Sequence, residues 1–263
     1  MRLEQATPTQ VGDIWRTASE RVPGRPLVAE VAAAAVGDLY ACFAESLVLA
    51  RAFLTVPYAT LPPGRRRFAE ELAHAAHLAD LLAPHTPVLC LLATRGSLPA
   101  WNHCGQSRGH AAIPLLSDAF VASIPMLSRL LKELGLPLTW VQDPGMDLER
   151  QTLGTEVGLF FVADARAAID EQGRQIIAAQ PFVAEHGVRS VFAVGGTVFG
   201  GAALSLIFFA RDAIAQHRAR AFMPLVNQMK AMIVSRGSMA RVFAADELAA
   251  DELPAGTLAA GDP

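Results

Sequence analysis

The spacing of apolar residues predicts a series of amphipathic helices along the chain. A helical period over 9–21 places Val11, Ile14 and Trp15 on one face, and the segment Pro23-Gly24-Arg25-Pro26 ends it. The same kind of period predicts further helices over 27–45, 65–82, 117–134, 174–186 and 213–234.

Short apolar runs bounded by turn residues predict strands between these helices. They cover 46–57, 88–93 and 157–163, with another beginning at 138–141 and a hairpin over 188–211. Helices and strands do not alternate regularly, so the fold class expected is α+β.

The apolar stretch Ser190–Ala210 holds 21 residues without a charge, which is long enough to span a bilayer. It is broken by the pairs Gly195-Gly196 and Gly200-Gly201, and its two halves are rich in β-branched and aromatic residues. Two strands joined by a glycine-rich turn fit this pattern better than one helix. We therefore expect a hairpin and no membrane association.

Composition supports a folded protein and argues against one class of partner. The chain has 263 residues, 52% hydrophobic and 18% charged, enough for a sizeable core. The net charge of −3 comes mainly from 241–263, which holds five acidic residues and one basic residue. The remaining body is nearly neutral and has no basic stripe, so we expect no nucleic-acid partner.

The three cysteines are Cys42, Cys90 and Cys104, too few and too scattered for a disulfide framework. No signal-peptide core is visible in Met1–Trp15, so we expect a cytoplasmic location. Neither a GxGxxG nor a GxxxxGK[ST] motif is present, and the sequence names no cofactor.

The chain divides into three parts on these patterns. Residues 1–26 form an N-terminal helical extension, 27–236 the main domain, and 237–263 an acidic, low-complexity tail that we expect to be flexible.

We expect the triplet Arg65-Arg66-Arg67 to be a solvated helix start. Positive charge is unfavourable at a helix N-terminus, and the acidic tail is a candidate to neutralise the charge of this triplet.

Four segments in order resemble a known type of module. They are Ser107–Leu115, Ile124–Leu136, Val188–Gly196 and Leu204–Arg211, followed by the amphipathic helix 213–234. Together, over about residues 28–234, they resemble an uncharacterised GAF-like module at the front of some bacterial sensor histidine kinases.

This resemblance implies an antiparallel sheet with helices packed on its faces and terminal helices that pair between subunits. It also implies a non-enzymatic sensor that binds a small molecule and passes a signal on. No kinase or other effector domain follows Val234, so we expect the signal to go through a protein partner. A homodimer is expected through the terminal helices, with Met223, Met229 and Met232 of helix 213–234 at its seam.

The richest cluster of polar and aromatic residues lies in the loop between the strand 88–93 and the helix 117–134. It consists of Trp101, His103, Cys104, Arg108 and His110. In a GAF-like fold such a loop would close over a pocket on the sheet, with Trp101 stacking on a ligand and Arg108 and His110 binding an anionic or carbonyl group. The other interpretation is that Arg108 and His110 tie down a long loop by bonding backbone carbonyls.

Two further functions stay open. An enzyme on the same scaffold would use Cys104 or His110 as its reactive group, and a protein-interaction scaffold would leave the pocket empty. No catalytic motif is present, and we expect no metal site, although His103, Cys104 and His110 are possible ligands and His74 and His77 share one helix face.

Overall fold

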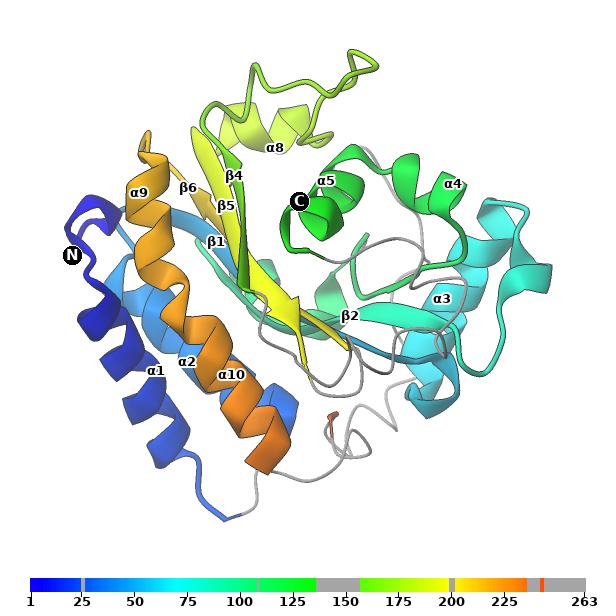
Figure 1. The fold of residues 1–263 in the computed structure, drawn as a ribbon, viewed down its shortest axis with the longest axis horizontal. Helices are drawn as coiled ribbons and strands as arrows, with labels where there is room; N and C mark the ends of the chain where they lie inside the picture. The colour runs from blue at the N-terminus through cyan, green and yellow to red at the C-terminus, as the bar shows by residue number, and fades with distance from the viewer. Residues whose placement is uncertain (25–26, 108, 136–156, 199–201, 236–241, 244–263) are drawn as a thin grey trace.

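One antiparallel sheet with helices on both faces forms the protein (Figure 1). The structure is a computed structural model, and it describes residues 1–24, 27–107, 109–135, 157–198, 202–235 and 242–243. In that part of the chain the sheet has six strands in the order β3-β2-β1-β6-β5-β4. The strands are β1 (Leu47–Pro57), β2 (Pro87–Gly96), β3 (Ala112–Pro114), β4 (Val157–Val162), β5 (Ser190–Thr197) and β6 (Ala203–Ala210). The helices are α1 (Pro8–Arg21), α2 (Val28–Cys42), α3 (Pro63–Ala75), α4 (Asp118–Ala122), α5 (Pro125–Glu133), α8 (Gln180–Glu185), α9 (Gln216–Ala219) and α10 (Pro224–Ser235). The expected α+β class, an antiparallel sheet with helices packed on it, is confirmed.

Helices from both ends of the sequence cover one face of the sheet. In Figure 1, α1, α2 and α10 lie together on one side of the strands. The alanine-rich α2 packs on β1 and β2, α10 packs on β5 and β6, and α1 contacts both helices. Small buried side chains such as Ala32 and Ala35 let α2 lie close to the sheet. Thr7 caps α1 by accepting a hydrogen bond from the backbone N–H of Gln10.

The opposite face carries α5, and two glycines let its end lie against the strands. A Cβ on Gly158 would lie 2.5 Å from the carbonyl oxygen of Glu133, and a Cβ on Gly195 would lie 2.7 Å from Cδ1 of Leu134. Gly158 and Gly195 are partners in the β4–β5 register. The absence of side chains at this pair therefore sets how closely the C-terminal end of α5 approaches the sheet.

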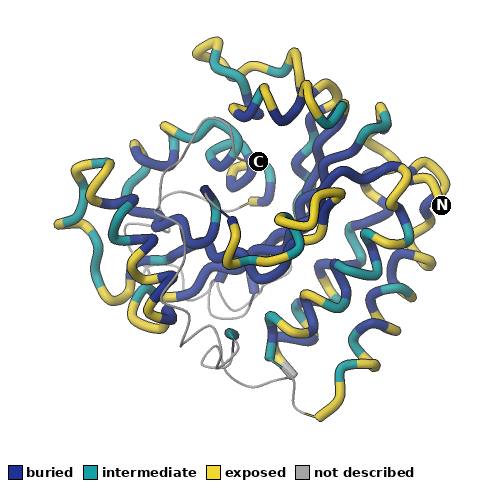
Figure 2. The backbone as a smooth tube through the Cα atoms, turned by 180° about the vertical axis from the view of Figure 1, so that it is seen from behind, coloured by how far each residue is buried: buried dark blue, intermediate teal, exposed yellow. Residues whose placement is uncertain are grey.

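The sheet is buried on both faces, as the dark strands in Figure 2 show. Every residue of β1 except Pro57 is buried, and β6 is buried throughout. Strands covered on both sides are continuously apolar, because neither face meets water. Arg51 and Thr55 are polar exceptions in β1.

The apolar stretch Ser190–Ala210 forms the predicted hairpin of β5 and β6. No helix in the described ranges has the length and apolar character needed to cross a bilayer. The pair Gly195-Gly196 lies inside β5 rather than in the turn, which corrects its predicted place. Gly200-Gly201, like the strand predicted to begin at 138–141, lies outside the described residues.

The helix predicted over 65–82 ends at Ala75, ahead of the separate 3-10 turn Ala79–Leu81. Three other predicted helices are interrupted or shortened, and each of the helices that forms there has a proline in its first turn. Pro125 begins α5 and separates it from α4, and Pro224 begins α10 after the short α9. The helix predicted over 174–186 forms only as α8, with Pro181 in its first turn. A proline fits the first turn of a helix because no backbone N–H is needed there. Before Pro125 the chain is extended at Ile124. Met223, before Pro224, keeps helical backbone angles of φ −57° and ψ −34° and follows a short 3-10 turn.

Arg65 is not on a solvated helix start, as the sequence pattern suggested. Its side chain is 3% exposed, and Nη1 donates a 2.7 Å hydrogen bond to the carbonyl of Ala111. Its guanidinium also lies 4.5 Å from the ring centre of Phe243. The preceding Val242 is buried and accepts a hydrogen bond from the N–H of Ala29. Residues 237–241 and 244–263 of the predicted tail lie outside the described residues.

The methionines that we expected at a dimer seam pack, fully or in part, against the chain's own core. Met229 and Met232 are buried against the chain's own core, and Met223 is half-buried against it. The side chains of Met229 and Met232 are therefore not presented to a second copy.

Candidate functional site

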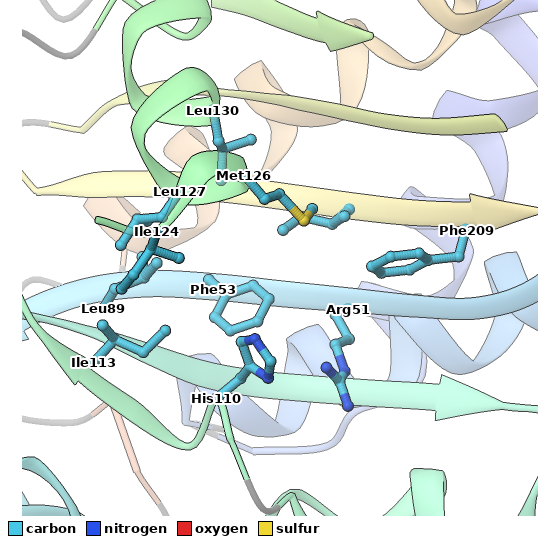
Figure 3. A pocket seen from close by; sticks show the side chains of 11 residues that line it. Arg51, Phe53, Leu89, His110, Ile113, Ile124, Met126, Leu127, Leu130 and Phe209 are labelled. Atoms are coloured by element: carbon cyan, nitrogen blue, oxygen red, sulfur yellow. The ribbon is translucent and has the colours of Figure 1, made fainter. Parts of the chain in front are cut away.

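A pocket lies between the sheet and α5 (Figure 3). Its cavity measures about 60 Å³. Ligand pockets in proteins commonly measure about 300–1,000 Å³, so a small organic molecule would fit only if the walls moved apart. The lining residues are Arg51, Phe53, Leu89, His110, Ile113, Ile124, Met126, Leu127, Leu130, Ile207 and Phe209.

The floor of the pocket comes from alternate positions on three neighbouring strands. Arg51 and Phe53 lie on β1, Leu89 on β2, and Ile207 and Phe209 on β6. Residues two apart on a strand point to the same face, so β1 and β6 each contribute two side chains at this spacing and β2 contributes one. The paired strands β1, β2 and β6 thus bring together residues that are far apart in the sequence.

Arg51 is a buried cation in this floor, with 3% of its surface exposed. Its Nε donates to Oγ1 of Thr94 on β2 at 3.5 Å. That hydroxyl in turn donates to the backbone carbonyl of Trp101 at 2.9 Å. The short chain of hydrogen bonds connects the guanidinium to the loop that follows β2.

His110 is the second polar residue of the wall. Its Nδ1 is shielded from solvent and has no hydrogen-bond partner among the described residues, although the residue as a whole is partly exposed. Burial, with a smaller effect from the nearby charge of Arg51, lowers the pKa of His110 from 6.5 to about 3. The ring is therefore neutral at physiological pH, with one nitrogen able to donate or accept a hydrogen bond.

Helix α5 forms the roof, and its charged residues fix it to β4. Arg129 donates from Nη2 to the carbonyl of Phe161 at 2.9 Å, and the N–H of Phe161 donates to Glu133 Oε2 at 3.1 Å. Arg129 and Glu133 also pair with each other at 2.7 Å. The adjacent face of the helix carries Met126, Leu127 and Leu130, which line the pocket.

Of the four predicted site residues that the structure describes, His110 lines this pocket and the other three do not. Trp101 packs edge-on against Phe182 at 5.4 Å and His186 at 4.7 Å between ring centres. It also covers Gly96, where a Cβ would lie 2.7 Å from the indole ring. Trp101 therefore joins α8 to the end of β2 instead of lining the pocket.

His103 and Cys104 do not line the pocket either. His103 is exposed, and Cys104 is half-buried at the start of a short 3-10 turn. Arg108 lies outside the described residues. His74 and His77 are exposed on and just beyond α3. Across the described ranges, no three His, Cys, Asp or Glu side chains form a group that could hold a metal ion.

Sequence reasoning missed Arg51, Phe53 and the residues of α5. One signal was available for Arg51, because it is the one charged residue in the apolar run Leu47–Pro57. A charge that a strand buries on both faces is costly unless it is partnered or functional. The α5 residues carried no such signal, since apolar residues at helical spacing also describe ordinary core packing.

Comparisons with known proteins find structural likeness only. No family model matches the chain, and no curated protein matches it. Among solved structures, the phycoerythrobilin-bound GAF domain of a cyanobacterial phytochrome aligns with a TM-score of 0.45 and 10% identity, over 86% of this chain and 95% of that one. The phycocyanobilin-bound GAF domain of a cyanobacterial phytochrome gives 0.45 and 11%, over 86% and 94%. Both are GAF domains, but a likeness at this level does not decide what this chain binds.

Proposed function

We propose that this chain is a GAF-like sensor domain that binds a small molecule between the sheet and α5 and signals through a protein partner. The observation that carries the proposal is the pocket itself. Nine of the eleven lining residues in the described part of the chain are apolar, while Arg51 and His110 supply polar groups. Small-molecule sites typically combine apolar walls with a few placed polar groups that orient the ligand.

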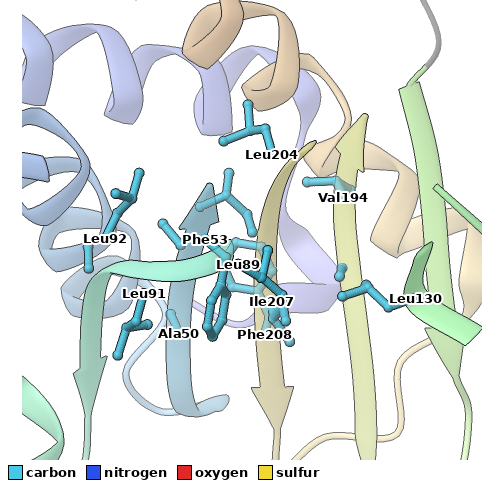
Figure 4. Packing of buried hydrophobic residues seen from close by; sticks show 14 of the residues in the cluster. Ala50, Phe53, Leu89, Leu91, Leu92, Leu130, Val194, Leu204, Ile207 and Phe208 are labelled. Carbon is cyan, nitrogen blue, oxygen red and sulfur yellow. The ribbon is translucent and has the colours of Figure 1, made fainter. Parts of the chain in front are cut away.

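A route for the signal is suggested by the two faces of the same strands. Ile207 lines the pocket, whereas the next residue, Phe208, belongs to the core on the helix-covered side (Figure 4). The ring of Phe208 lies 5.1 Å from the ring of Phe222, two residues before the start of α10. A ligand that shifts β6 would therefore also shift the packing at the start of α10.

A homodimer through the terminal helices and a cytoplasmic location belong to the same proposal. Any dimer contact on α10 would use residues outside its buried face, among them Val234, which is 59% exposed. A reducing compartment agrees with Cys42, Cys90 and Cys104, which form no disulfide with one another. Light scattering of the purified chain would give its oligomeric state directly.

Of the two residues that an enzyme on this scaffold would use, one does not lie at this site. It called for Cys104 or His110 as the reactive group, and Cys104 does not line the pocket. Among the lining residues that the structure describes, none is a nucleophile beside His110. The ligand-binding interpretation needs neither group to react.

The test is a small-molecule thermal-shift screen on three proteins. Met126→Trp fills the pocket from a half-exposed position, and Met223→Trp makes the same change on the opposite layer of the fold. We expect compounds that stabilise the natural chain and the Met223→Trp variant but not Met126→Trp. Hits that stabilise all three equally would refute the pocket as the site, and a screen without hits would favour the interaction scaffold.

The output route is tested on the same protein with a compound found in that screen. Amide hydrogen exchange should change in 220–235 when the compound binds, because β6 packs against this segment. Unchanged exchange there, with changes in α5 and β1, would refute the route through α10.

A further inference from the structure

Two residues that follow α10 lie back against the body of the protein. Val242 is 2% exposed, and Phe243 is half-buried and packs against the core. Helix α10 itself ends at Ser235. Together the two residues form a strap, Val242–Phe243, that contacts two helices from the first third of the chain.

The first contact of the strap is with the N-terminal end of α2. The carbonyl of Val242 accepts a 3.0 Å hydrogen bond from the N–H of Ala29, in the first turn of that helix. The first N–H groups of a helix have no partner inside it, and the N-cap side chain of Leu27 supplies none. The strap therefore acts as a backbone cap for α2.

The second contact leads to the wall of the pocket. The ring of Phe243 lies 4.5 Å from the guanidinium of Arg65 in α3, and Nη1 of this arginine donates to the carbonyl of Ala111 at 2.7 Å. Ala111 directly follows His110 and lies two residues before Ile113, and both of these residues line the pocket. Figure 3 shows them along the same edge of the cavity. A series of direct contacts thus connects the strap to this wall.

The wall at His110 and Ile113 is the one most able to move when the pocket opens. A cavity of about 60 Å³ admits a small organic molecule only if its walls move apart. The floor strands β1 and β6 lie inside the sheet, and α5 is fixed to β4 by Arg129 and Glu133. In the described sheet β3 is an outermost strand of three residues, so it has few ladder bonds to lose.

We infer that the strap holds the pocket closed and that opening of the pocket releases the strap. This inference rests on the proposed function, since it concerns access to the same pocket. Outward movement of 110–113 carries the Ala111 carbonyl away from Arg65. The guanidinium then cannot keep both this hydrogen bond and its place over Phe243. Such coupling is reciprocal, so loss of the strap contacts favours the open pocket by the same factor.

The strap is held lightly enough for its release to be reversible. In the described residues it is attached by one backbone hydrogen bond, one buried valine side chain and one cation–π contact. Each of these contributes a small free energy, which the binding of a ligand can offset. Because the strap follows α10 in the chain, its release also removes a restraint on the C-terminal end of that helix, the proposed output.

The test uses the fluorescent probe anilinonaphthalene sulfonate, which binds apolar surfaces and is far larger than the closed cavity. Phe243→Ala removes the ring over Arg65. We expect this variant to bind the probe at least about tenfold more tightly than the natural chain, the ratio that loss of one buried cation–π contact corresponds to. Adding Met126→Trp to Phe243→Ala should abolish the gain, which separates binding in the pocket from binding to loosened structure.

A matched variant controls for the loss of an aromatic side chain. Tyr40→Ala removes a half-buried ring of α2 that packs against the core and does not line the pocket. This variant should bind the probe as the natural chain does. Circular dichroism of each variant confirms that it is folded.

Release of the strap is measured at the amide of Ala29 by hydrogen exchange, followed residue by residue with NMR. Saturating probe should speed the exchange of this amide in the natural chain, because the Val242 carbonyl leaves it. Amides in the middle of α2 are the reference and should keep their rates.

The outcomes separate this inference from the proposed function. Equal probe binding by Phe243→Ala and the natural chain would refute the hold of the strap on the pocket. A gain that survives Met126→Trp would refute it too, as would an Ala29 amide whose exchange is unchanged by the bound probe. In each of these cases, screening hits that Met126→Trp blocks would still uphold the proposed function. Hits that stabilise the natural chain, Met126→Trp and Met223→Trp equally would refute the proposed function, whatever the result with Phe243→Ala.

Discussion

The buried His110 makes the fold less stable in mild acid, and the size of this effect follows from its pKa. The unfolded chain binds a proton at His110 near pH 6.5, whereas the folded chain does so only near pH 3. Between these values the unfolded state binds more protons, so acid favours unfolding. The stabilising contribution is complete above about pH 6.5 and falls as the pH drops towards 3.

The loss of unfolding free energy at pH 5 follows from how far this pH lies below 6.5, the pKa of His110 in the unfolded chain. A difference of about 1.5 pH units corresponds to about 2 kcal/mol at about 1.4 kcal/mol per unit. His110→Gln removes the titrating group and keeps a polar side chain in the wall. The natural chain should therefore lose about 2 kcal/mol more unfolding free energy than His110→Gln between pH 7 and pH 5.

Urea unfolding at pH 7, 6 and 5 measures this difference, with tryptophan fluorescence as the signal. Trp15 is 2% exposed in the core and reports the global transition. The control is His103→Gln, which changes a histidine of the neighbouring loop that is exposed to solvent. Its pH dependence should follow that of the natural chain. Equal slopes for the natural chain and His110→Gln would show that His110 is not buried as a neutral ring.

Two further substitutions, each with a control substitution, test the packing around the sheet. Gly158→Ala would place a Cβ 2.5 Å from the Glu133 carbonyl oxygen and should destabilise the fold by about 1–3 kcal/mol, whereas Gly37→Ala in α2, with open space around it, should stabilise it by up to about 1 kcal/mol. Urea unfolding measures both, and a neutral Gly158→Ala would refute the close approach of α5. Arg65→Met removes the hydrogen bond to Ala111 and the contact with Phe243, so a loss of about 1.5–3 kcal/mol is expected. Arg67→Met, at a half-exposed pair with Glu71, should change stability by less than about 0.5 kcal/mol, and equal losses for the two would refute the buried role of Arg65.

Elements with strong local signals were predictable from the sequence. The period of Val11, Ile14 and Trp15 predicted α1, and the glycine-interrupted apolar run predicted the β5–β6 hairpin. The interrupted helices were less predictable, because apolar spacing continues across the breaks. Ile124 already has an extended backbone, with φ −108° and ψ 94°, ahead of Pro125. Before α8, the Asp170 side chain instead accepts hydrogen bonds from the backbone N–H groups of Gln172 and Arg174 and forms a turn.

The site was less predictable than the fold. A cluster along the sequence drew attention to Trp101, His103 and Cys104, yet residues adjacent in a loop point in different directions. The pocket depends on strand register, which places Arg51 of β1 opposite Thr94 of β2 and Ile207 of β6. His110 belongs to both sets because it lies near the end of the loop, two residues before β3.

The attachment of α5 to Phe161 has a consequence for solubility as well as for binding. Phe161 lies in β4, the last strand of the sheet, and both its N–H and its carbonyl are occupied by side chains of α5. Backbone groups on a sheet edge otherwise invite pairing with strands of other molecules. The helix that closes the pocket thus also shields this edge from self-association. A substitution that detaches α5 would expose apolar floor and strand edge together, so its first symptom would be aggregation during purification, before any loss of affinity is measured.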